Sequence, residues 1–515
     1  MSDKLQRLEL VWPGKNERVD VEPRILIEDV EKSYSADPKI QEKMNRQLFK
    51  QEPEIAPTFD NMLIHGDNLL ALKALEAEYS GKVKCIYIDP PFNTGSAFKY
   101  YDDGLEHSIW LSMMSARLEI LRNLLSPDGA IFIHIDYTEE AYLKVLCDEI
   151  FGRNNFRNTI VTSRIKKNIR ERELIKALNY AQDAILFYAK SDDCFIRPPE
   201  KEKIQEERWH ALDASGLRTG MDYELFGHRP PAGRHWAWSY ERAMKAIENG
   251  ILKPHPKTGR PIYKIEASNT IMLDTNWTDI QASAFKWDFP GGEKNEVLIQ
   301  RILDMATNPG DLVLDSFLGS GTTAAVAHKM GRRWIGIEMG DHIYSHCLPR
   351  LKKVIDCEDA GGITKSVKWQ GGGGFKFYEL GSTLIVTDKH GRQVISDKYN
   401  PEMLAEAMCK LMGYKYASDK ESYWKQGYSS EKNFIFTTTM NVEEQLLAEM
   451  SQALGDGNLL ICCGAFTGNK TAYDNITIKK IPQAILKKCQ WGSAGYPLPV
   501  REDFSDEDFE FEDEE

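Results

Sequence analysis

Residues 312–338 read LVLDSFLGSGTTAAVAHKMGRRWIGIE, and this stretch decides the fold. An apolar segment ends at Asp315, a loop with glycines follows, then an alanine-rich segment of helical length, and WIGIE ends at Glu338. This order predicts a strand, a loop, a helix and a second strand. A strand that returns through a helix runs parallel to the strand before it, so the stretch predicts part of an α/β sheet.

The same alternation occurs earlier in the chain. NMLIHGDNLLALKALEAEYSGKVKCIYIDPPF predicts a strand, a turn, a helix and a strand, and GAIFIHID and DAILFYAK predict two more strands. The alternation stops at about 191–285, where Arg, His, Trp, Gly and Pro are frequent, and then resumes. We therefore predict a doubly wound, mostly parallel α/β sheet in two pieces, 56–190 and 286–360, with an insert at 191–285.

Four further segments complete the predicted organisation. Residues 1–55 are polar and predict an N-terminal arm with one or two helices. A glycine-rich linker at 361–375 leads to a smaller C-terminal α/β domain at 376–500. An acidic tail at 501–515 is predicted to be disordered.

The net charge of −13 alone argues against a nucleic-acid partner. Residues 502–515 carry ten acids and no base, however, and removing them leaves −3, so local basic patches can bind DNA. No apolar run is long enough to span a membrane and no signal-peptide pattern opens the sequence, which predicts a soluble, cytoplasmic protein without a membrane partner. Nine cysteines without a CxxC pair predict reduced thiols and no metal site.

The loop after Asp315 has the spacing G-x-G-x-x-A at Gly319, Gly321 and Ala324. Such glycines let a nucleotide-like ligand approach the backbone at a helix N-terminus, and an acid such as Glu338 can bind both ribose hydroxyls. The loop alone favours an adenosine-containing cofactor and fits NAD and S-adenosylmethionine (SAM) equally. A tight turn without a ligand is the alternative, and a Walker A loop is excluded because no lysine follows the glycines.

The Asp-Pro-Pro-Phe segment follows the strand CIYI. An exocyclic amine on an aromatic base is a poor nucleophile because its lone pair is delocalised into the ring. Two acceptors aimed at its N–H bonds localise that lone pair, and the Asp89 carboxylate and the Pro90 carbonyl can supply them. Pro91 restricts the backbone before it, and Phe92 offers a face for a base that has left the duplex. A plain strand end with Phe92 in the core is the alternative.

The two motifs reinforce each other. In a doubly wound sheet, ligands bind outside the carboxyl ends of the strands, near the switch in strand order. CIYID and LVLD both end there, so the amine pocket and the cofactor loop are predicted to face each other. This arrangement favours SAM over NAD and methyl transfer over hydride transfer.

The motifs resemble those of β-class amino DNA methyltransferases, in which Asp-Pro-Pro-Phe or -Tyr precedes the SAM loop. More narrowly, the chain is similar to the Mod (modification) subunits of type III restriction–modification systems. The similarity is strong over 56–360 and weaker over 376–500; it includes GDNLLALKAL, YIDPPFNTGSAFKYYDD, HSIWLSMMSARLEILRNLLSPDGAIFIHID, EIFGRNNF, WTDI, VLDSFLGSGTTAAVAHKMGRRWIGIE and NITIKKIP. It implies a Rossmann-like methyltransferase sheet with an inserted target-recognition region.

The resemblance also implies roles for particular residues. The catalytic pocket would comprise Asp89, Pro90, Pro91 and Phe92. The SAM-binding residues would be Asp67, Lys294, Asp315, Phe317, Gly319, Gly321, Thr322 and Glu338. Taken alone, Asp67 could instead be the cap of the helix that starts beside it. The family usually has TQKP where this chain reads GGEKNE, so Lys294 is matched and the proline is not.

Two basic regions are candidates for DNA contact. The insert contains Arg229, Arg234 and Trp236; arginine suits guanine edges and phosphates, and aromatic rings stack on unpaired bases. Tryptophans packed in a local core are the alternative. The second region, 153–176, is a charge run that contacts phosphates or forms a solvated face. Its candidate residues are Arg164, Lys166, Lys167 and Arg170.

These observations predict a site-specific methyltransferase that transfers a methyl group from SAM to the 6-amino group of adenine in double-stranded DNA. Methylation of the 4-amino group of cytosine, a non-catalytic DNA-recognition subunit and an NAD-dependent dehydrogenase are the alternatives. The dehydrogenase would leave Asp89–Phe92 without a use. The resemblance to Mod subunits implies a homodimer, and a restriction helicase–nuclease subunit as a further partner, with 376–500 serving assembly.

Overall fold

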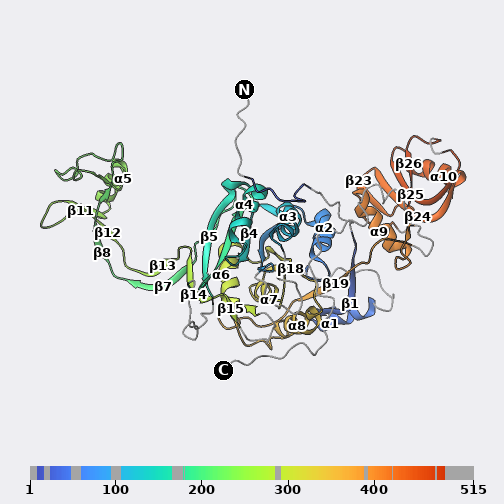
Figure 1. The fold of residues 1–515 in the computed structure, drawn as a ribbon, viewed down its shortest axis with the longest axis horizontal. Helices are drawn as coiled ribbons and strands as arrows, with labels where there is room; N and C mark the ends of the chain where they lie inside the picture. The colour runs from blue at the N-terminus through green and yellow to red at the C-terminus, as the bar shows by residue number, and fades with distance from the viewer. Residues whose placement is uncertain are drawn as a thin grey trace. The chain divides into compact units, whose positions relative to one another are not determined.

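The computed structural model describes residues 9–16, 24–47, 60–93, 106–164, 178, 180–284, 292–387, 393–419, 422–469 and 472–481. The chain divides into two compact units (Figure 1). The first comprises Met1–Arg197 and Thr275–Glu515, and the second is Pro198–Asp274. The second unit lies inside the insert predicted at 191–285.

A ten-stranded sheet forms the centre of the first unit, with the strand order β1-β19-β2-β18-β17-β3-β4-β6-β5-β14. The six strands from β19 to β4 are parallel, whereas β1 and β6 run antiparallel to their neighbours. The sheet therefore confirms the predicted class, a mostly parallel α/β fold. Its strands are β1 (Leu26–Ser35), β2 (Met62–His65), β3 (Val83–Ile88), β4 (Leu125–Ile135), β5 (Phe156–Ser163), β6 (Gln182–Ala189), β14 (Asn276–Gln281), β17 (Leu312–Asp315), β18 (Arg333–Glu338) and β19 (Gly374–Leu380).

Helices cover both faces of this sheet (Figure 1). One face packs against α2 (Asn68–Tyr79), α3 (His107–Leu124) and α4 (Glu140–Cys147). The other packs against α6 (Glu296–Ala306), α7 (Thr322–Lys329) and α8 (Leu348–Ile355). Along β3, Ile86 and Ile88 lie in the first core and Cys85 and Tyr87 in the second. Burial on both faces explains why the central strands read as continuous apolar runs.

The switch in strand order lies between β3 and β17. These two strands are neighbours, and β3 is continued outward by β4 while β17 is continued in the other direction by β18. Cys85 pairs with Val313 and Ile86 with Leu314, so both strands end at the same edge of the sheet. Asp89 follows β3 and Asp315 ends β17 at this edge, which is where ligands bind in open α/β sheets.

Two strands differ from the predicted organisation. β1 lies within 1–55, for which the sequence predicts only helices, and is followed by α1 (Pro38–Gln47). Its sequence LIEDVEKSYS gives little strand signal because most of its residues are exposed or half-buried at the sheet edge. β19 crosses the predicted boundary at 375, since it pairs with β1 on one side and β2 on the other. The central sheet thus extends to Leu380.

The second unit is built mainly from short antiparallel strands around one helix. Its small core contains Leu212, Leu225, Trp236, Ala243, Ala246 and Leu252. The elements are β7 (Glu200–Gln205), β8 (Arg208–Ala211), β9 (Asp213–Ser215), β10 (Arg234–Trp236), α5 (Tyr240–Glu248), β11 (Leu252–Pro254), β12 (Pro261–Ile265) and β13 (Ser268–Met272). β7 lies at the start of this unit and β13 at its end, and the two strands pair as a two-stranded ribbon.

The C-terminal part of the described chain has its own five-stranded sheet, ordered β22-β23-β24-β25-β26. Its strands are β22 (Lys415–Tyr416), β23 (Gly427–Ser430), β24 (Asn433–Glu443), β25 (Asn458–Thr467) and β26 (Ile476–Lys480). It is accompanied by α9 (Pro401–Met412), α10 (Glu444–Leu454) and the hairpin β20 (Ile385–Thr387) and β21 (Gln393–Ile395). A last short pair, β15 (Ser283–Ala284) and β16 (Glu293–Lys294), precedes α6. The acidic tail at 501–515 lies outside the described residues.

Within the described residues, no helix combines the length and the apolar composition that crossing a membrane requires. The same part of the chain contains no group of three or more His, Cys, Asp or Glu side chains arranged to hold a metal ion.

Candidate active site

Asp89 is the first residue after β3 and carries two differently placed carboxylate oxygens. Its Oδ2 lies 2.7 Å from the Nζ atom of Lys294, and the two side chains are 26% and 14% exposed. Its Oδ1 is buried and accepts no hydrogen bond from any described residue. A buried acceptor without a donor costs free energy, so this oxygen is poised for a donor that comes from a ligand.

The backbone of the Asp-Pro-Pro-Phe segment is held from two helices. Trp110 of α3 donates its indole Nε1–H to the Pro91 carbonyl at 2.9 Å. Asn93 has a φ of 60°, and its side-chain amide donates to Glu139 Oε1 at 2.6 Å, next to the start of α4. A positive φ is uncommon for a residue other than glycine, and Asn tolerates it better than most. The segment is therefore fixed on both sides of Phe92.

Phe92 is flanked by an imidazole and an ammonium group. Its ring stacks on His134 of β4, with centroids 5.8 Å apart and planes at 27°. Lys294 Nζ lies over the same ring, 5.0 Å from its centroid. Tyr87 OH lies 3.0 Å from His134 Nδ1 and orients the imidazole. Burial, with the nearby Lys294 charge, lowers the pKa of His134, so the imidazole that supports Phe92 is neutral at neutral pH.

The glycine loop begins at the buried Asp315, whose Oδ1 accepts the Phe317 N–H at 2.9 Å. Gly319 and Gly321 have φ values of 54° and 82°, a region that side chains other than glycine rarely adopt, and Gly321 starts α7. Burial raises the pKa of Asp315 to about 7, and the negative charges of Asp89 and Glu338 add to the rise. The field of Asp89 at Asp315 links the two motifs electrostatically.

Glu338, at the end of β18, closes the loop from the other side. Its Oε2 accepts the Gly319 N–H at 2.7 Å, and its Oε1 accepts the N–H groups of Met339 and Gly340 at 2.9 and 3.0 Å. His342 Nε2 lies 3.2 Å from the same Oε1. The carboxylate is thus fixed next to the glycines, in the position where the predicted cofactor would meet it. Its role as the ribose acid stays a prediction.

Asp67 caps α2, because its Oδ1 accepts the N–H groups of Leu69 and Leu70 at 2.9 and 3.1 Å. Its Oδ2 lies 3.3 Å from an Nη atom of the buried Arg117. The cap interpretation left open by the sequence therefore describes one oxygen of this residue. A contact between Asp67 and a cofactor remains a prediction.

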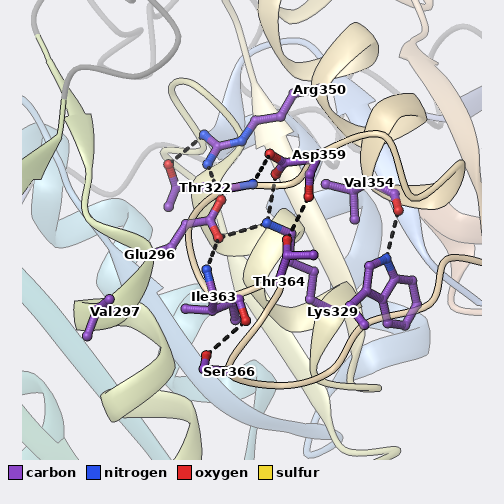
Figure 2. Close-up of polar contacts among 12 residues, drawn as sticks. Glu296, Val297, Thr322, Lys329, Arg350, Val354, Asp359, Ile363, Thr364 and Ser366 are labelled. Atoms are coloured by element: carbon purple, nitrogen blue, oxygen red, sulfur yellow. Dashed lines mark hydrogen bonds and ion pairs between the residues drawn. The ribbon is translucent and has the colours of Figure 1, made fainter.

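Thr322 faces a buried ionic cluster behind the glycine loop (Figure 2). Arg350 of α8 donates to Thr322 Oγ1 at 2.8 Å and to Glu296 Oε1 at 2.9 Å. Lys329 of α7 donates to Glu296 Oε2 at 2.8 Å and to Asp359 Oδ2 at 2.7 Å. Figure 2 shows these side chains converging from α6, α7, α8 and the segment after α8. The sequence analysis missed this cluster, since its members are far apart in the chain and no motif contains them.

The residues predicted to contact DNA have different environments. Lys166, Lys167 and Arg170 lie outside the described residues. An Nη atom of Arg164 lies 3.3 Å from both Asp136 Oδ2 and Asp183 Oδ1, so its charge is already paired. Arg229 is exposed. Arg234 pairs with Asp213 at 2.5 Å.

Trp236 is only 1% exposed in the core of the second unit, and its Nε1–H donates to the Tyr223 carbonyl at 2.7 Å. This placement fits the alternative of a tryptophan packed in a local core. A different aromatic residue is better placed: Trp209 of β8 is partly exposed, and Lys253 Nζ lies 3.6 Å from its ring centroid. The sequence signal for it is the run Arg208-Trp209-His210, in which an aromatic residue lies between two basic ones.

The site therefore has two parts at one edge of the sheet. Asp89, Phe92 and Lys294 are in direct contact beside β3, and Asp315, Gly319 and Glu338 are joined by proximity and hydrogen bonds beside β17 and β18. A carboxylate with an oxygen that accepts no hydrogen bond from the described residues, next to an aromatic ring, can hold a base that carries an amine. A glycine loop closed by a fixed acid can hold an adenosine.

Comparison with known proteins agrees with this geometry. Residues 83–347, about half of the chain, match the family described as DNA methylase, and the chain belongs to that family. It is 34% identical to the probable type III restriction–modification enzyme HindVI Mod subunit of Haemophilus influenzae, over 69% of this chain and 58% of that protein. It is 30% identical to the type II methyltransferase EcaI of Enterobacter cloacae, over 64% of this chain and 75% of that protein.

A third relative, the type III restriction–modification enzyme StyLTI Mod subunit of Salmonella typhimurium, is 30% identical over 51% of this chain and 49% of that protein. The predicted similarity to Mod subunits is confirmed. The chain spans between about half and three quarters of the length of these three relatives.

Proposed function

We propose that this protein transfers a methyl group from SAM to the 6-amino group of adenine at specific sites in double-stranded DNA. The observation that carries the proposal is the Asp89 carboxylate, whose buried Oδ1 lacks a donor among the described residues. Asp89 lies beside Phe92, at the end of β3. The glycine loop follows the neighbouring strand β17, so both lie at the switch in strand order. The exocyclic amine of a stacked base supplies the missing donor.

Phe92, Asp89 and Pro90 have different roles in the proposed reaction. Phe92 stacks the extruded base, and its ring is held in place by His134. Asp89 accepts one N–H of the amine and the Pro90 carbonyl accepts the other, which localises the nitrogen lone pair. SAM, when bound, supplies an electrophilic methyl group. Membership of the DNA methylase family supports this reading.

The glycine loop fits an adenosine-containing cofactor. The backbone at Gly319 and Gly321 has the positive φ values of a close-approach loop, and Glu338 presents a fixed carboxylate beside it. NAD would fit the loop equally but would leave the pocket at Asp89 without a reaction to serve. We therefore propose SAM as the cofactor.

Replacing Glu338 with Gln should weaken SAM binding by about 1–3 kcal/mol, the usual range for hydrogen bonds to a charged group. This corresponds to roughly 5- to 150-fold in Kd, measured by titration calorimetry. The matched control is Glu379→Gln: Glu379 lies next to the last residue of β19 and, like Glu338, is paired in register with His65. Equal SAM affinity in both variants, or wild-type protein that binds NAD and not SAM, would contradict the assignment.

The nature of the methylated base is tested directly. DNA from a host that expresses the chain is digested to nucleosides, and the methylated nucleosides are measured by mass spectrometry. N6-methyl-2′-deoxyadenosine in excess of the level in a host with an Asp89→Asn variant supports the proposal. N4-methyl-2′-deoxycytidine would move the substrate to cytosine and keep the chemistry. The absence of both would overturn the function.

The second unit is the proposed DNA-reading part. β8, β11 and β12 form a small sheet on which Trp209 is opposite Lys264 and close to Lys253. Lys264 already pairs with Glu207 at 2.9 Å, whereas Lys253 is exposed. The Lys253 ammonium lies over the Trp209 ring on the surface of this sheet. Such a pair suits a DNA phosphate and the sugar and base edges next to it.

Lys253→Ala should weaken duplex binding similarly for all sequences and reduce the slope of log K against log salt by about 0.9, the value for one phosphate contact. Fluorescence anisotropy over a range of salt concentrations measures this slope. Lys264→Ala is the control, since its ammonium is already neutralised by Glu207. A slope for Lys253→Ala equal to that of wild type would exclude a phosphate contact at this lysine.

We also propose that the protein forms a homodimer and associates with a restriction helicase–nuclease subunit. The support is the similarity to Mod subunits of type III restriction–modification enzymes. The C-terminal sheet β22–β26 contains none of the residues of the candidate active site and is available for assembly. Light scattering of the purified chain, alone and with the product of a neighbouring reading frame, tests both associations.

A further inference from the structure

We propose that Lys294 is a positioning residue that holds the Asp89 carboxylate in the orientation needed for catalysis. This inference rests on the proposed function and adds to it a role for a side chain that the sequence assigns to cofactor binding. The carrying observation is the contact of one ammonium group with both members of the base pocket. Its Nζ lies 2.7 Å from Asp89 Oδ2 and 5.0 Å from the Phe92 ring centroid.

The division of labour between the two Asp89 oxygens follows from this contact. A free carboxylate can rotate about its Cβ–Cγ bond and exchange its oxygens. The ammonium holds Oδ2, so Oδ1 stays directed into the pocket without a donor among the described residues. An ionised carboxylate only accepts hydrogen bonds, so Oδ1 can pair only with a group that donates one. Lys294 thus prepares Asp89 for the amine.

The strand that carries Lys294 is itself fixed. β16 pairs with β15, with Lys294 opposite Ser283, and Asn295 caps the start of α6 through the Val297 N–H. Glu293 is buried, and its Oε2 lies 3.3 Å from an Nη atom of Arg350. A lysine has several rotatable bonds, so anchoring its backbone reduces the range over which its ammonium can move.

Arg350 connects this strand to the glycine loop. The guanidinium that meets Glu293 also donates to the Ser320 carbonyl at 3.2 Å. It donates to Thr322 Oγ1 at 2.8 Å as well (Figure 2). Arg350 is 1% exposed, so these contacts are buried. The orientation of Asp89 and the position of the cofactor loop are therefore set from one buried side chain, which aligns the two halves of the reaction.

The test separates positioning from cofactor binding. Lys294→Met keeps the length of the side chain and removes its charge, and Lys294→Arg keeps the charge. Single-turnover methylation at saturating SAM should fall about 10- to 100-fold in Lys294→Met, the size of effect that misplacement of a reacting group produces. Its Kd for SAM, measured by calorimetry, should stay within about twofold of wild type, and Lys294→Arg should recover part of the lost rate.

A matched control removes the lysine of another lysine–aspartate pair near β3. Lys84 of β3 pairs with Asp128 at 2.6 Å, at the opposite end of β3 from Asp89, and Lys84→Met should leave the methylation rate unchanged. A tenfold weaker SAM affinity in Lys294→Met with an unchanged rate at saturation would make Lys294 a cofactor ligand and overturn the proposal. A second result would also overturn the proposal: an unchanged or faster rate in Lys294→Met, together with tighter binding of DNA that carries 2-aminopurine at the target. Lys294 would then occupy the position of the base and not orient Asp89.

The inference and the proposed function fail separately. If wild-type protein forms no methylated nucleoside, the proposed function is wrong and the rate comparison has no reference. If wild-type protein methylates DNA and Lys294→Met does so equally fast, only the role of Lys294 is wrong.

Discussion

Asp89→Asn should lower the single-turnover rate of DNA methylation by about 10²- to 10³-fold, the loss typical of one preorganised polar contact to the reacting group. The side-chain amide keeps one oxygen, which can still accept a hydrogen bond from Lys294. It carries no charge, however, and an NH₂ donor replaces the second acceptor oxygen. SAM and DNA should both still bind, because Phe92 and the glycine loop are unchanged. Rapid-quench kinetics with saturating SAM and duplex measures the rate, and calorimetry and anisotropy measure the two affinities.

Asp128→Asn is the control for this change. Asp128 likewise pairs with a lysine, Lys84 of β3, at 2.6 Å, but its side chain is 54% exposed, and Lys84 is at the opposite end of β3 from Asp89. Its substitution should leave rate and affinities as in wild type. Full activity in Asp89→Asn would show that the carboxylate charge is not used, and the proposed chemistry would then have no acceptor of sufficient strength.

The second large effect concerns stability. Lys329→Met should lower the free energy of unfolding by about 3–5 kcal/mol, the cost of removing one partner from a buried ionic group. Lys329 is the shared donor to Glu296 and Asp359, and the three side chains are at most 5% exposed. Without the ammonium, Asp359 loses its contact with Lys329, and Glu296 keeps the Arg350 guanidinium and the Ile363 N–H. Urea denaturation followed by circular dichroism measures the change.

Lys73→Met is the matched surface substitution. Lys73 pairs with Glu76 on α2 at 2.7 Å, with side chains 39% and 22% exposed, and such pairs contribute about 0–1 kcal/mol. Methylation by the surviving folded fraction of Lys329→Met should also fall, because the cluster holds Thr322 through Arg350. A loss of stability as small as that of Lys73→Met would falsify the view that this cluster is desolvated.

The same cluster gives the stability a defined pH dependence. Burial would raise the pKa of Glu296, but the charges of Arg350 and Lys329 outweigh it and hold that pKa below the usual range. A depressed pKa in the folded state means that Glu296 contributes stability above the pKa of the unfolded chain, and that this contribution is lost as the pH falls through the folded value. Between neutral and acidic pH, the wild-type chain should therefore lose more of its free energy of unfolding than Glu296→Gln loses.

Strand-end motifs were the part of the site that the sequence could predict. Asp89 and Asp315 each follow an apolar run, and the topology of a doubly wound sheet brings such ends together whatever the loops do. β1 could not be predicted, because an edge strand buries too little to leave a regular pattern. The ionic cluster around Arg350 was missed for the opposite reason: full burial of charge has no periodic signature, and its partners come from separate helices.

Individual contacts were less predictable than positions. The sequence shows that Lys294 lies near the start of a helix, but only the structure shows that its ammonium meets Asp89. Similarly, Trp236 and Trp209 are equally aromatic in the sequence, and only packing decides that the first lies in a core and the second on a surface. Side-chain direction depends on tertiary neighbours, which a single sequence does not encode locally.

The ribbon of β7 and β13 has an evolutionary consequence. Glu200 pairs with Met272, and the Leu273 N–H donates to the Pro199 carbonyl at 2.8 Å, so the chain enters and leaves the second unit at one place. For the catalytic sheet, the whole unit is then equivalent to a short hairpin, and its length adds little to the entropy of closing that loop. If the second unit reads the target sequence, as proposed above, a different unit with the same ribbon could replace it without refolding the sheet, and the target sequence should change while the active site stays the same. A chimera that carries a foreign second unit and methylates the donor's site would demonstrate this, and one that folds yet methylates only the original site would refute it.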